Sequence, residues 1–112
     1  MKFKSHEEQG VVIVELKGNI LGGPDASTLN EQLHQFIDEG KKKIVVDLGQ
    51  VTFMNSSGLG MLIGGLTTMK NARGDMRLAR PNERVENLLT ITKLFTVFQC
   101  FESIEAAVAS FV

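Results

Sequence analysis

Hydroxyl side chains and glycines gather in one short stretch of the chain, residues 55–60, which has the sequence NSSGLG. An apolar, β-branched run precedes this stretch and an apolar pattern with helical spacing follows it, so we expect it to join a strand to a helix. The N-terminus of a helix has unpaired backbone N–H groups and a partial positive charge, and it stabilises an anionic group placed there. Ser56 or Ser57 therefore stands where the fold would tolerate a phosphate.

The same residues also have a purely structural interpretation. Asn55, Ser56 or Ser57 can be the N-cap of the helix, because each carries a side-chain oxygen that accepts a hydrogen bond from a backbone N–H group. Gly58 and Gly60 then let the helix approach the sheet closely. The residue types in this stretch leave both interpretations open.

A serine at a strand-to-helix turn also occurs in the nucleophile elbow of hydrolases. Such a serine needs a general base, and the histidines of the chain are His6 and His34. His6 falls in the first expected edge segment and His34 lies beside Leu33 on the first expected helix, so we expect both at the surface. Because the G-x-S-x-G motif is also absent around Ser57, we predict that the protein is not an enzyme.

Glycines at positions 58, 60, 64 and 65 raise the alternative of a phosphate-binding loop for a nucleotide. The G-x-x-x-x-G-K-[ST] pattern with its lysine is absent, and close packing of the helix explains Gly64 and Gly65 better. Weak nucleotide binding stays open as a secondary alternative. Cys100, His6 and His34 are isolated and lack the spacing of metal ligands, so we expect no metal and no cofactor.

Apolar patterns predict the strands that position this stretch. Continuous apolar, β-branched runs indicate buried strands at residues 11–16 and 44–48. Shorter strands are expected at residues 76–79 and 98–101. Residues 3–7 are expected to pair with the first run as an edge strand, across a turn at residues 9–10.

Helical spacing of apolar residues indicates helices after Pro24, at residues 59–69, behind residues 81–82 and after Ser103. Strands that alternate with single helices imply right-handed crossovers and a mostly parallel sheet. We therefore expect an α/β fold in a single domain, residues 1–112, with four or five strands and about four helices.

The ends of the helices are predicted from their capping residues. Asp25 or Ser27 is expected to cap the first helix, Gly40 to end it, and Gly74 to break the second. The lysines at positions 41–43 suit the negative end of the first helix. We interpret them as a solvated turn and not as a nucleic-acid patch.

Length and composition limit the class of protein. A chain of 112 residues with 43% hydrophobic content is long enough for one compact core and too short for two. The formal net charge of -1 does not indicate a basic surface that would bind a nucleic acid. A single cysteine excludes an intrachain disulfide, and no stretch approaches the roughly 20 apolar residues of a membrane span. We expect a cytoplasmic protein with no direct nucleic-acid partner and no membrane.

The order of these elements and one sequence string resemble a known family. The string D-L-x-x-V-x-F-M-N-S-S-G-L-G, which covers residues 47–60, is similar to the turn of STAS domains in anti-sigma-factor antagonists. The likeness covers nearly the whole chain, including residues 80–82 and the closing segment 101–107. It implies a STAS-type fold and an interaction protein.

The resemblance also implies a switch with particular partners. In this family the second serine of the turn, here Ser57, is phosphorylated by an anti-sigma factor that is also a serine kinase, and the phosphorylated protein no longer holds that kinase. The unmodified protein captures the kinase and releases a sigma factor for transcription, while a PP2C-like phosphatase is a further expected partner. The residues expected to contact the kinase are Asn55, Ser56, Ser57, Gly58 and Leu59.

Two positions depart from the family pattern. Asn55 stands where the family usually has Asp. The common G-E-L-D turn after the second strand appears as GNIL at residues 18–21, with the carboxylate of Asp25 displaced beyond two glycines. A neutral Asn55 repels a phosphoserine less than Asp would, and it also loses a charge contact with a kinase.

A further interpretation keeps the fold and changes the partner. STAS domains also occur as scaffold parts of signalling assemblies and as accessory subunits of transporters. A neighbouring gene for a serine kinase or a PP2C-like phosphatase would favour the switch, and one for a permease would favour the accessory subunit. The sequence leaves this alternative open.

Overall fold

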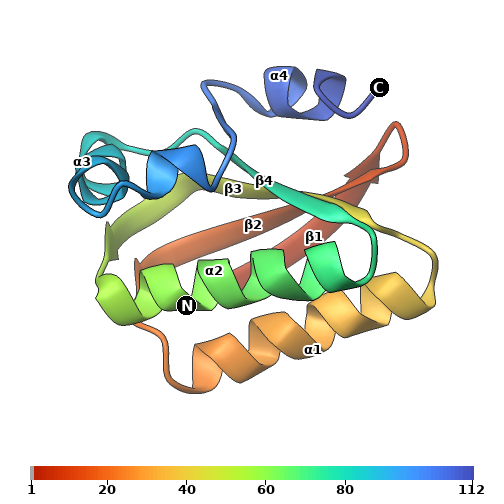
Figure 1. Ribbon diagram of the computed structural model, residues 1–112, viewed down its shortest axis with the longest axis horizontal. Helices are drawn as coiled ribbons and strands as arrows, with labels where there is room; N and C mark the ends of the chain where they lie inside the picture. Colours follow the sequence, from red (N-terminus) through yellow and green to blue (C-terminus); the bar gives the residue numbers. More distant parts are fainter. Residues whose placement is uncertain (1) are drawn as a thin grey trace.

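Five strands form a single sheet in the computed structural model, which describes residues 2–112 (Figure 1). They lie side by side in the order of the sequence, with β1 antiparallel to β2 and the other neighbours parallel. The strands are β1 (Lys2–Glu8), β2 (Val11–Ile20), β3 (Lys43–Met54), β4 (Asp75–Ala79) and β5 (Cys100–Phe101). The expected α/β fold with a mostly parallel sheet is therefore confirmed.

Among residues 2–112, four α-helices surround the sheet: α1 (Pro24–Asp38), α2 (Ser56–Asn71), α3 (Glu83–Ile91) and α4 (Ile104–Ala109). Each strand after β2 is added on the same side of the one before it, so right-handed crossovers place α1 and α2 on the same face. α4 follows the last strand and lies on the opposite face (Figure 1). A 3-10 helix, η1 (Leu94–Thr96), is too short to show an apolar period in the sequence.

No helix in the described part of the chain has both the length and the apolar character needed to cross a membrane.

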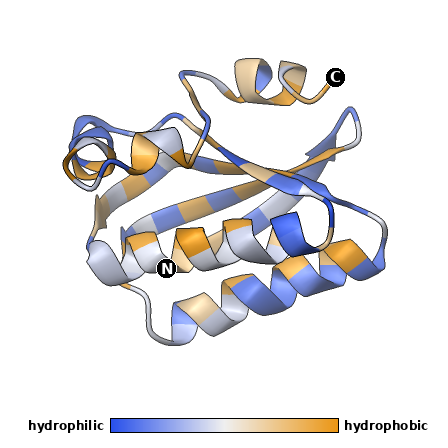
Figure 2. Ribbon diagram, in the orientation of Figure 1, coloured by the Kyte–Doolittle hydropathy of each residue, from blue (hydrophilic) through white to orange (hydrophobic). Residues whose placement is uncertain are grey.

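Side chains of the central strands alternate between two hydrophobic cores. Ile44 and Val46 of β3 belong to the larger core with α1 and α2. Val45 lies between them in the sequence and belongs to the smaller core with Ala107 and Val108 of α4. This arrangement explains why β2 and β3 are continuous apolar runs. Figure 2 shows the hydrophobic sides of α1 and α2 turned toward the sheet.

Two predicted chain reversals have the expected geometry. Gln9 and Gly10 join β1 to β2 with φ angles of 52° and 81°, as a two-residue type I′ hairpin turn requires. Gly40 follows α1 with a φ of 77°. The N–H of Lys41 donates to the carbonyl oxygen of Phe36 at 2.8 Å, which completes a Schellman motif.

The start of α1 differs from the prediction. Its N-cap is Gly23, with no side-chain hydrogen bond, whereas Asp25 or Ser27 was the expected cap. Pro24 occupies the first turn, where its fixed φ suits the helix and its missing N–H group needs no partner. The helix therefore begins before either polar side chain is in position to cap it.

The end of α2 also needs a correction. The helix ends at Asn71, ahead of Gly74, and the residue in the left-handed conformation is Arg73, with a φ of 65°. A Cβ atom added to Gly74 would lie 2.4 Å from the carbonyl oxygen of Lys42. Gly74 is therefore needed for close packing against Lys42, the residue before β3, and it does not break the helix.

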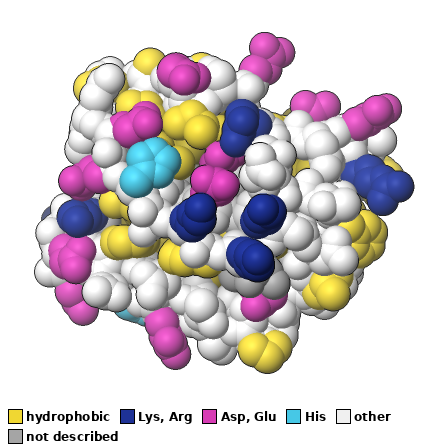
Figure 3. All heavy atoms as spheres, turned by 180° about the vertical axis from the view of Figure 1, so that it is seen from behind, with side chains coloured by type: hydrophobic (Ala, Val, Ile, Leu, Met, Phe, Trp, Pro, Cys, Tyr) yellow, Lys and Arg dark blue, Asp and Glu magenta, His cyan; other side chains and the backbone are white. Residues whose placement is uncertain are grey.

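β1 leaves one edge of the sheet open to solvent. Phe3 is partly buried against the larger core, and the rest of β1 is exposed. Lys2 and Lys4 of β1 gather beside Glu15 and Lys17 of β2. Figure 3 shows basic and acidic side chains mixed on the side of the molecule hidden in Figure 1. Charged side chains on an edge strand discourage pairing with a second sheet.

One charged side chain within the described residues is buried, that of Asp47 in β3. Nε and Nη2 of Arg80 donate to its two carboxylate oxygens at 2.8 and 2.7 Å, and the N–H of Gly49 donates to Oδ1 at 2.9 Å. The hydrogen bond to Asp47 raises the pKa of Arg80 and outweighs the opposite effect of burial. A Cβ atom added to Gly49 would lie 2.5 Å from the guanidinium, so a larger residue there would force the Arg80 side chain to shift. The ion pair fixes the end of β4 to β3.

Arg80→Ala is expected to lower the free energy of unfolding by about 3 kcal/mol, because it leaves the buried Asp47 carboxylate without its partner. This value is at the lower end of the range for buried ion pairs. The Arg80 side chain is 41% exposed, so in the variant water can reach the Asp47 carboxylate and replace part of the lost interaction. Urea unfolding followed by circular dichroism measures the change.

Arg84→Ala is the matched control, because Arg84 is an exposed arginine with no ion pair among the described residues. Its effect is expected to stay within about 0.5 kcal/mol. A loss below about 1 kcal/mol for Arg80→Ala would show that the pair behaves as an ordinary surface salt bridge.

Candidate functional site

The turn at residues 55–60 lies where β3 ends and α2 begins. Asn55 has an extended backbone (φ -99°, ψ -178°), and its Oδ1 accepts a hydrogen bond from the N–H of Gly58 at 2.8 Å. Asn55 is therefore the N-cap of α2. Ser56 and Ser57 occupy the first two positions of the helix and are exposed. Within residues 2–112 neither serine hydroxyl is engaged in a hydrogen bond.

Two glycines hold the first turn of α2 against the end of β2. A Cβ atom added to Gly58 would lie 2.1 Å from the carbonyl oxygen of Ile20, so backbone packs directly on backbone there. The N–H of Asn55 donates to the same oxygen at 3.3 Å. Gly22, in the loop between β2 and α1, has a φ of 81°, and a Cβ atom added to it would come within 3.0 Å of Ser57. Backbone contacts therefore determine the position of Ser57.

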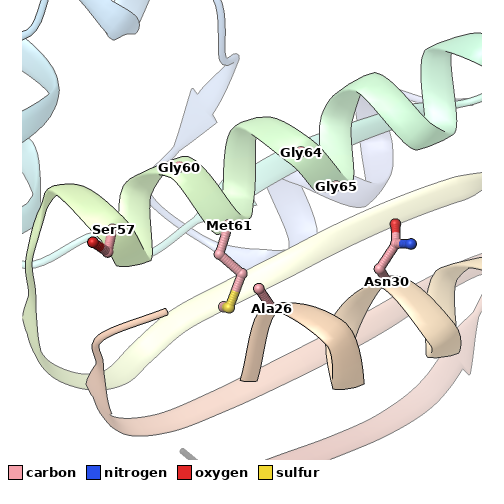
Figure 4. A pocket seen from close by; sticks show the side chains of 7 residues that line it. All are labelled: Ala26, Asn30, Ser57, Gly60, Met61, Gly64 and Gly65. Carbon is pink, nitrogen blue, oxygen red and sulfur yellow. The ribbon is translucent and has the colours of Figure 1, made fainter. Parts of the chain in front are cut away.

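Ser57 stands at one end of an open groove of about 360 Å³ between α1 and α2 (Figure 4). The groove is lined by Ala26, Asn30, Ser57, Gly60, Met61, Gly64 and Gly65. In Figure 4 the side chain of Met61 points from α2 toward Ala26 of α1. A Cβ atom added to Gly60 or Gly64 would have no neighbour within 4 Å, so the absence of side chains at these exposed positions leaves the groove open.

Gly64 and Gly65 therefore have different roles, although they are adjacent in the sequence. A Cβ atom added to Gly65 would lie 3.0 Å from Leu33 and 3.3 Å from the sulfur of Met76, as expected for close packing. The prediction of close packing is wrong for Gly64, because that position faces solvent on the groove side of α2.

The electrostatics of the turn favour an added anion. The first turn of α2 carries no acidic side chain, and its N-cap is a neutral amide. No carboxylate in that turn therefore balances the partial positive charge of the helix end. A phosphate on Ser57 Oγ would lie beside the free N–H groups of the first turn, where anions commonly bind.

The two histidines lie far from Ser57. His6 is exposed on β1, where its Nε2 is 3.2 Å from Oε1 of Glu8, and it pairs with Ile13 near the start of β2. His34 is exposed in the second half of α1, about 15 Å along the helix from its start. Neither is in position to act as a general base for Ser57. Among the described residues no group of three or more His, Cys, Asp or Glu side chains is arranged to hold a metal ion.

The sequence model of a protein family described as the STAS domain matches residues 2–107. The chain belongs to the STAS family. Over 111 residues it is 26% identical to a putative anti-sigma factor antagonist from Bordetella bronchiseptica, a match that covers 99% of this chain and 95% of that protein.

Solved structures share the fold of this STAS domain. The crystal structure of a putative anti-sigma factor antagonist from Thermotoga maritima has a TM-score of 0.85 at 25% identity, covering 96% of this chain and 92% of that one. The phosphorylated form of the Bacillus cell fate determinant SpoIIAA has a TM-score of 0.74 at 18% identity, covering 99% of this chain and 100% of that one.

The predicted contact residues of the STAS domain lie together in one turn, but they differ in exposure. Asn55 is half-buried, whereas Ser56 and Ser57 are exposed. Gly58 is buried against β2, and the Leu59 side chain is 2% exposed within the larger core. Gly58 and Leu59 therefore hold the turn in place, and Asn55, Ser56 and Ser57 form its outer surface. The sequence analysis missed Gly22 as a neighbour of Ser57, although the Gly22-Gly23 pair was a visible signal for a close backbone approach.

Two alanine substitutions in the first turns of α2 are expected to have opposite effects on stability. Gly58→Ala should lower the free energy of unfolding by at least about 2 kcal/mol, because the new methyl group collides with the Ile20 backbone. Gly60→Ala should raise it by about 0.5–1 kcal/mol, because alanine favours the helix and the position is open.

Chemical unfolding of the two variants beside the wild-type protein tests this contrast. Equal effects of the two substitutions would contradict the backbone contact between α2 and β2. The Gly60→Ala variant also serves as the control for a general effect of alanine at the start of α2.

Proposed function

We propose that this protein is an anti-sigma factor antagonist that binds an anti-sigma factor with serine-kinase activity through the first turn of α2, and that phosphorylation of Ser57 ends the binding. While unmodified, it holds the anti-sigma factor and leaves a sigma factor free to direct transcription. These partners act in the cytoplasm, where we place the protein. The observation that carries the proposal is the state of Ser57, which is exposed at the helix N-terminus with a hydroxyl free for modification.

The chemical step belongs to the kinase. Ser57 Oγ attacks the γ-phosphorus of an ATP molecule held by the kinase, the bond from that phosphorus to ADP breaks, and the hydroxyl proton passes to a base of the kinase. This chain supplies an accessible nucleophile and no catalytic group, so the protein is a substrate and a binding partner. A PP2C-like phosphatase hydrolyses the phosphoserine and restores the unmodified form.

The fold is expected to accept the phosphate without loss of stability. Negative charge in the first turn interacts favourably with the helix dipole, by roughly 0.3–1 kcal/mol. Asn55 supports this, because a carboxylate at the cap would repel the phosphate and the amide does not. The modification therefore changes the surface of the protein and leaves its core intact.

The interface with the kinase is affected differently. A kinase surface that packs on a neutral hydroxyl must desolvate the phosphate and faces its negative charge. A loss of about 2–5 kcal/mol in binding free energy corresponds to a complex weaker by roughly 30-fold to several thousand-fold. A single modification thus converts a binding surface into a repelling one.

Ser57→Asp is expected to melt within a few degrees of the wild-type protein and to bind the host's anti-sigma factor kinase at least about 30-fold more weakly. Ser57→Ala is the matched control, because it removes the hydroxyl without adding charge, and it should bind nearly as well as wild type. Thermal melts and titration calorimetry measure both properties.

Equal affinities for the Asp and Ala variants would contradict the switch. Mass spectrometry of the protein purified from its host, across residues 44–70, provides an independent test. Ser57 that stays unmodified while the kinase is active would favour a scaffold or an accessory subunit.

Asn55→Asp tests the position at which this chain departs from the family. Asp is an equally good N-cap, so the melting temperature should stay nearly unchanged. The added carboxylate lies beside Ser57, and it should change the affinity for the kinase or the rate of phosphorylation. Identical kinetics and affinity for the two proteins would show that residue 55 acts as a cap only.

A further inference from the structure

Exposed apolar side chains gather beside α3. Within residues 2–112 the exposed large hydrophobic residues are Leu21, Phe53, Ile91, Phe95, Val97 and Val112. Phe53 lies at the end of β3, Ile91 ends α3, and Phe95 and Val97 lie in or next to η1, which contacts α3. We call these four residues the α3 apolar surface. Ile91 is 78% exposed, and an exposed apolar patch commonly marks a site of protein interaction.

An open groove of about 350 Å³ runs through this surface between Phe53 and Ile91. Met54 and Leu88 line it together with these two residues, so much of its lining is apolar. Its polar residues are Asn87 and Arg84. Arg84 has no ion pair with any described residue. The groove therefore fits an apolar side chain of a partner that places a carboxylate beside it.

Hydrogen bonds through Asn82 fix this groove in the folded protein. Asn82 Oδ1 accepts from the N–H of Val85 at 2.9 Å and caps α3. Its Nδ2 donates to the carbonyl oxygen of Val51 in β3 at 2.8 Å. One side chain thus ties the start of α3 to the end of β3, and a preformed groove loses little conformational entropy when a partner binds.

The α3 apolar surface is continuous with the turn that carries Ser57. One residue, Met54, separates Phe53 from the N-cap Asn55, so the groove and Ser57 flank the same connection from β3 to α2. Figure 1 shows α3 and the start of α2 at the same end of the molecule, with the end of β3 between them. A protein that covers Ser57 is therefore in position to reach the groove as well.

We infer that the α3 apolar surface is a second contact for the anti-sigma factor, which inserts an apolar side chain between Phe53 and Ile91 and pairs an acidic residue with Arg84. The inference rests on the proposed function and deepens it. A few well-packed residues in desolvated pockets commonly carry most of the affinity of an interface. This contact adds affinity whatever the state of Ser57, and it selects which anti-sigma factor is bound.

Ile91→Asp tests the contact, with Val112→Asp as the matched control. Val112 is 81% exposed, and Figure 1 places the C-terminus at the other end of the molecule from α3. Both variants should melt close to wild type. Titration with the host's anti-sigma factor kinase should show binding weakened at least about tenfold by Ile91→Asp, and unchanged within about twofold by Val112→Asp.

Phosphorylation kinetics provide a second readout. Ile91→Asp should raise the KM for this protein as a kinase substrate about tenfold and leave kcat unchanged, because Ser57 itself is untouched. Arg84→Glu should also weaken binding, since it places a carboxylate against the acidic residue of the partner.

The experiments distinguish failure of the second contact from failure of the proposed function. If Ile91→Asp binds like wild type while Ser57→Asp does not, the second contact is wrong and the proposed switch stands. If the unmodified wild-type protein binds none of the host's anti-sigma factor kinases, the proposed function fails and this inference fails with it.

Discussion

The contact between Gly58 and the carbonyl oxygen of Ile20 is the constraint on which the site depends. Because no side chain separates them, the first turn of α2 rests directly on the end of β2. The N–H of Asn55 reaches the same oxygen, and Gly22 closes on Ser57 from the neighbouring loop. Backbone contacts of this kind do not depend on side-chain rotamers. They fix the backbone of Ser57 relative to the end of β2.

The ion pair that stabilises the sheet and the turn that carries Ser57 are separate parts of the structure. The buried Asp47 carboxylate and Arg80 join β3 to β4. The turn at Ser57 has a neutral cap and no acidic side chain in its first turn. A phosphate there would change the surface potential near the helix end, and it would not involve the ion pair that fixes the sheet.

Sequence patterns predicted the elements well and their ends less well. Continuous apolar runs located β2 and β3 because strands between two helical layers bury both faces. Three residues of the turn were chemically suitable as the cap, and only the backbone conformation distinguishes Asn55 from the two serines. Gly64 and Gly65 share one apolar window, so composition did not reveal which of them faces the core. The pairing of Asp47 with Arg80 joins positions far apart in the sequence, and no local pattern indicates it.

The order of the strands has a consequence for how the protein forms during synthesis. Since neighbours in the sheet are also neighbours in the chain, every new strand pairs with the one that left the ribosome before it. This order lets strand pairing begin at the N-terminal end of the chain. Ile20, Gly22, Asn55 and Gly58 all precede α3 in the chain, so the backbone contacts that position Ser57 need no residue of α3.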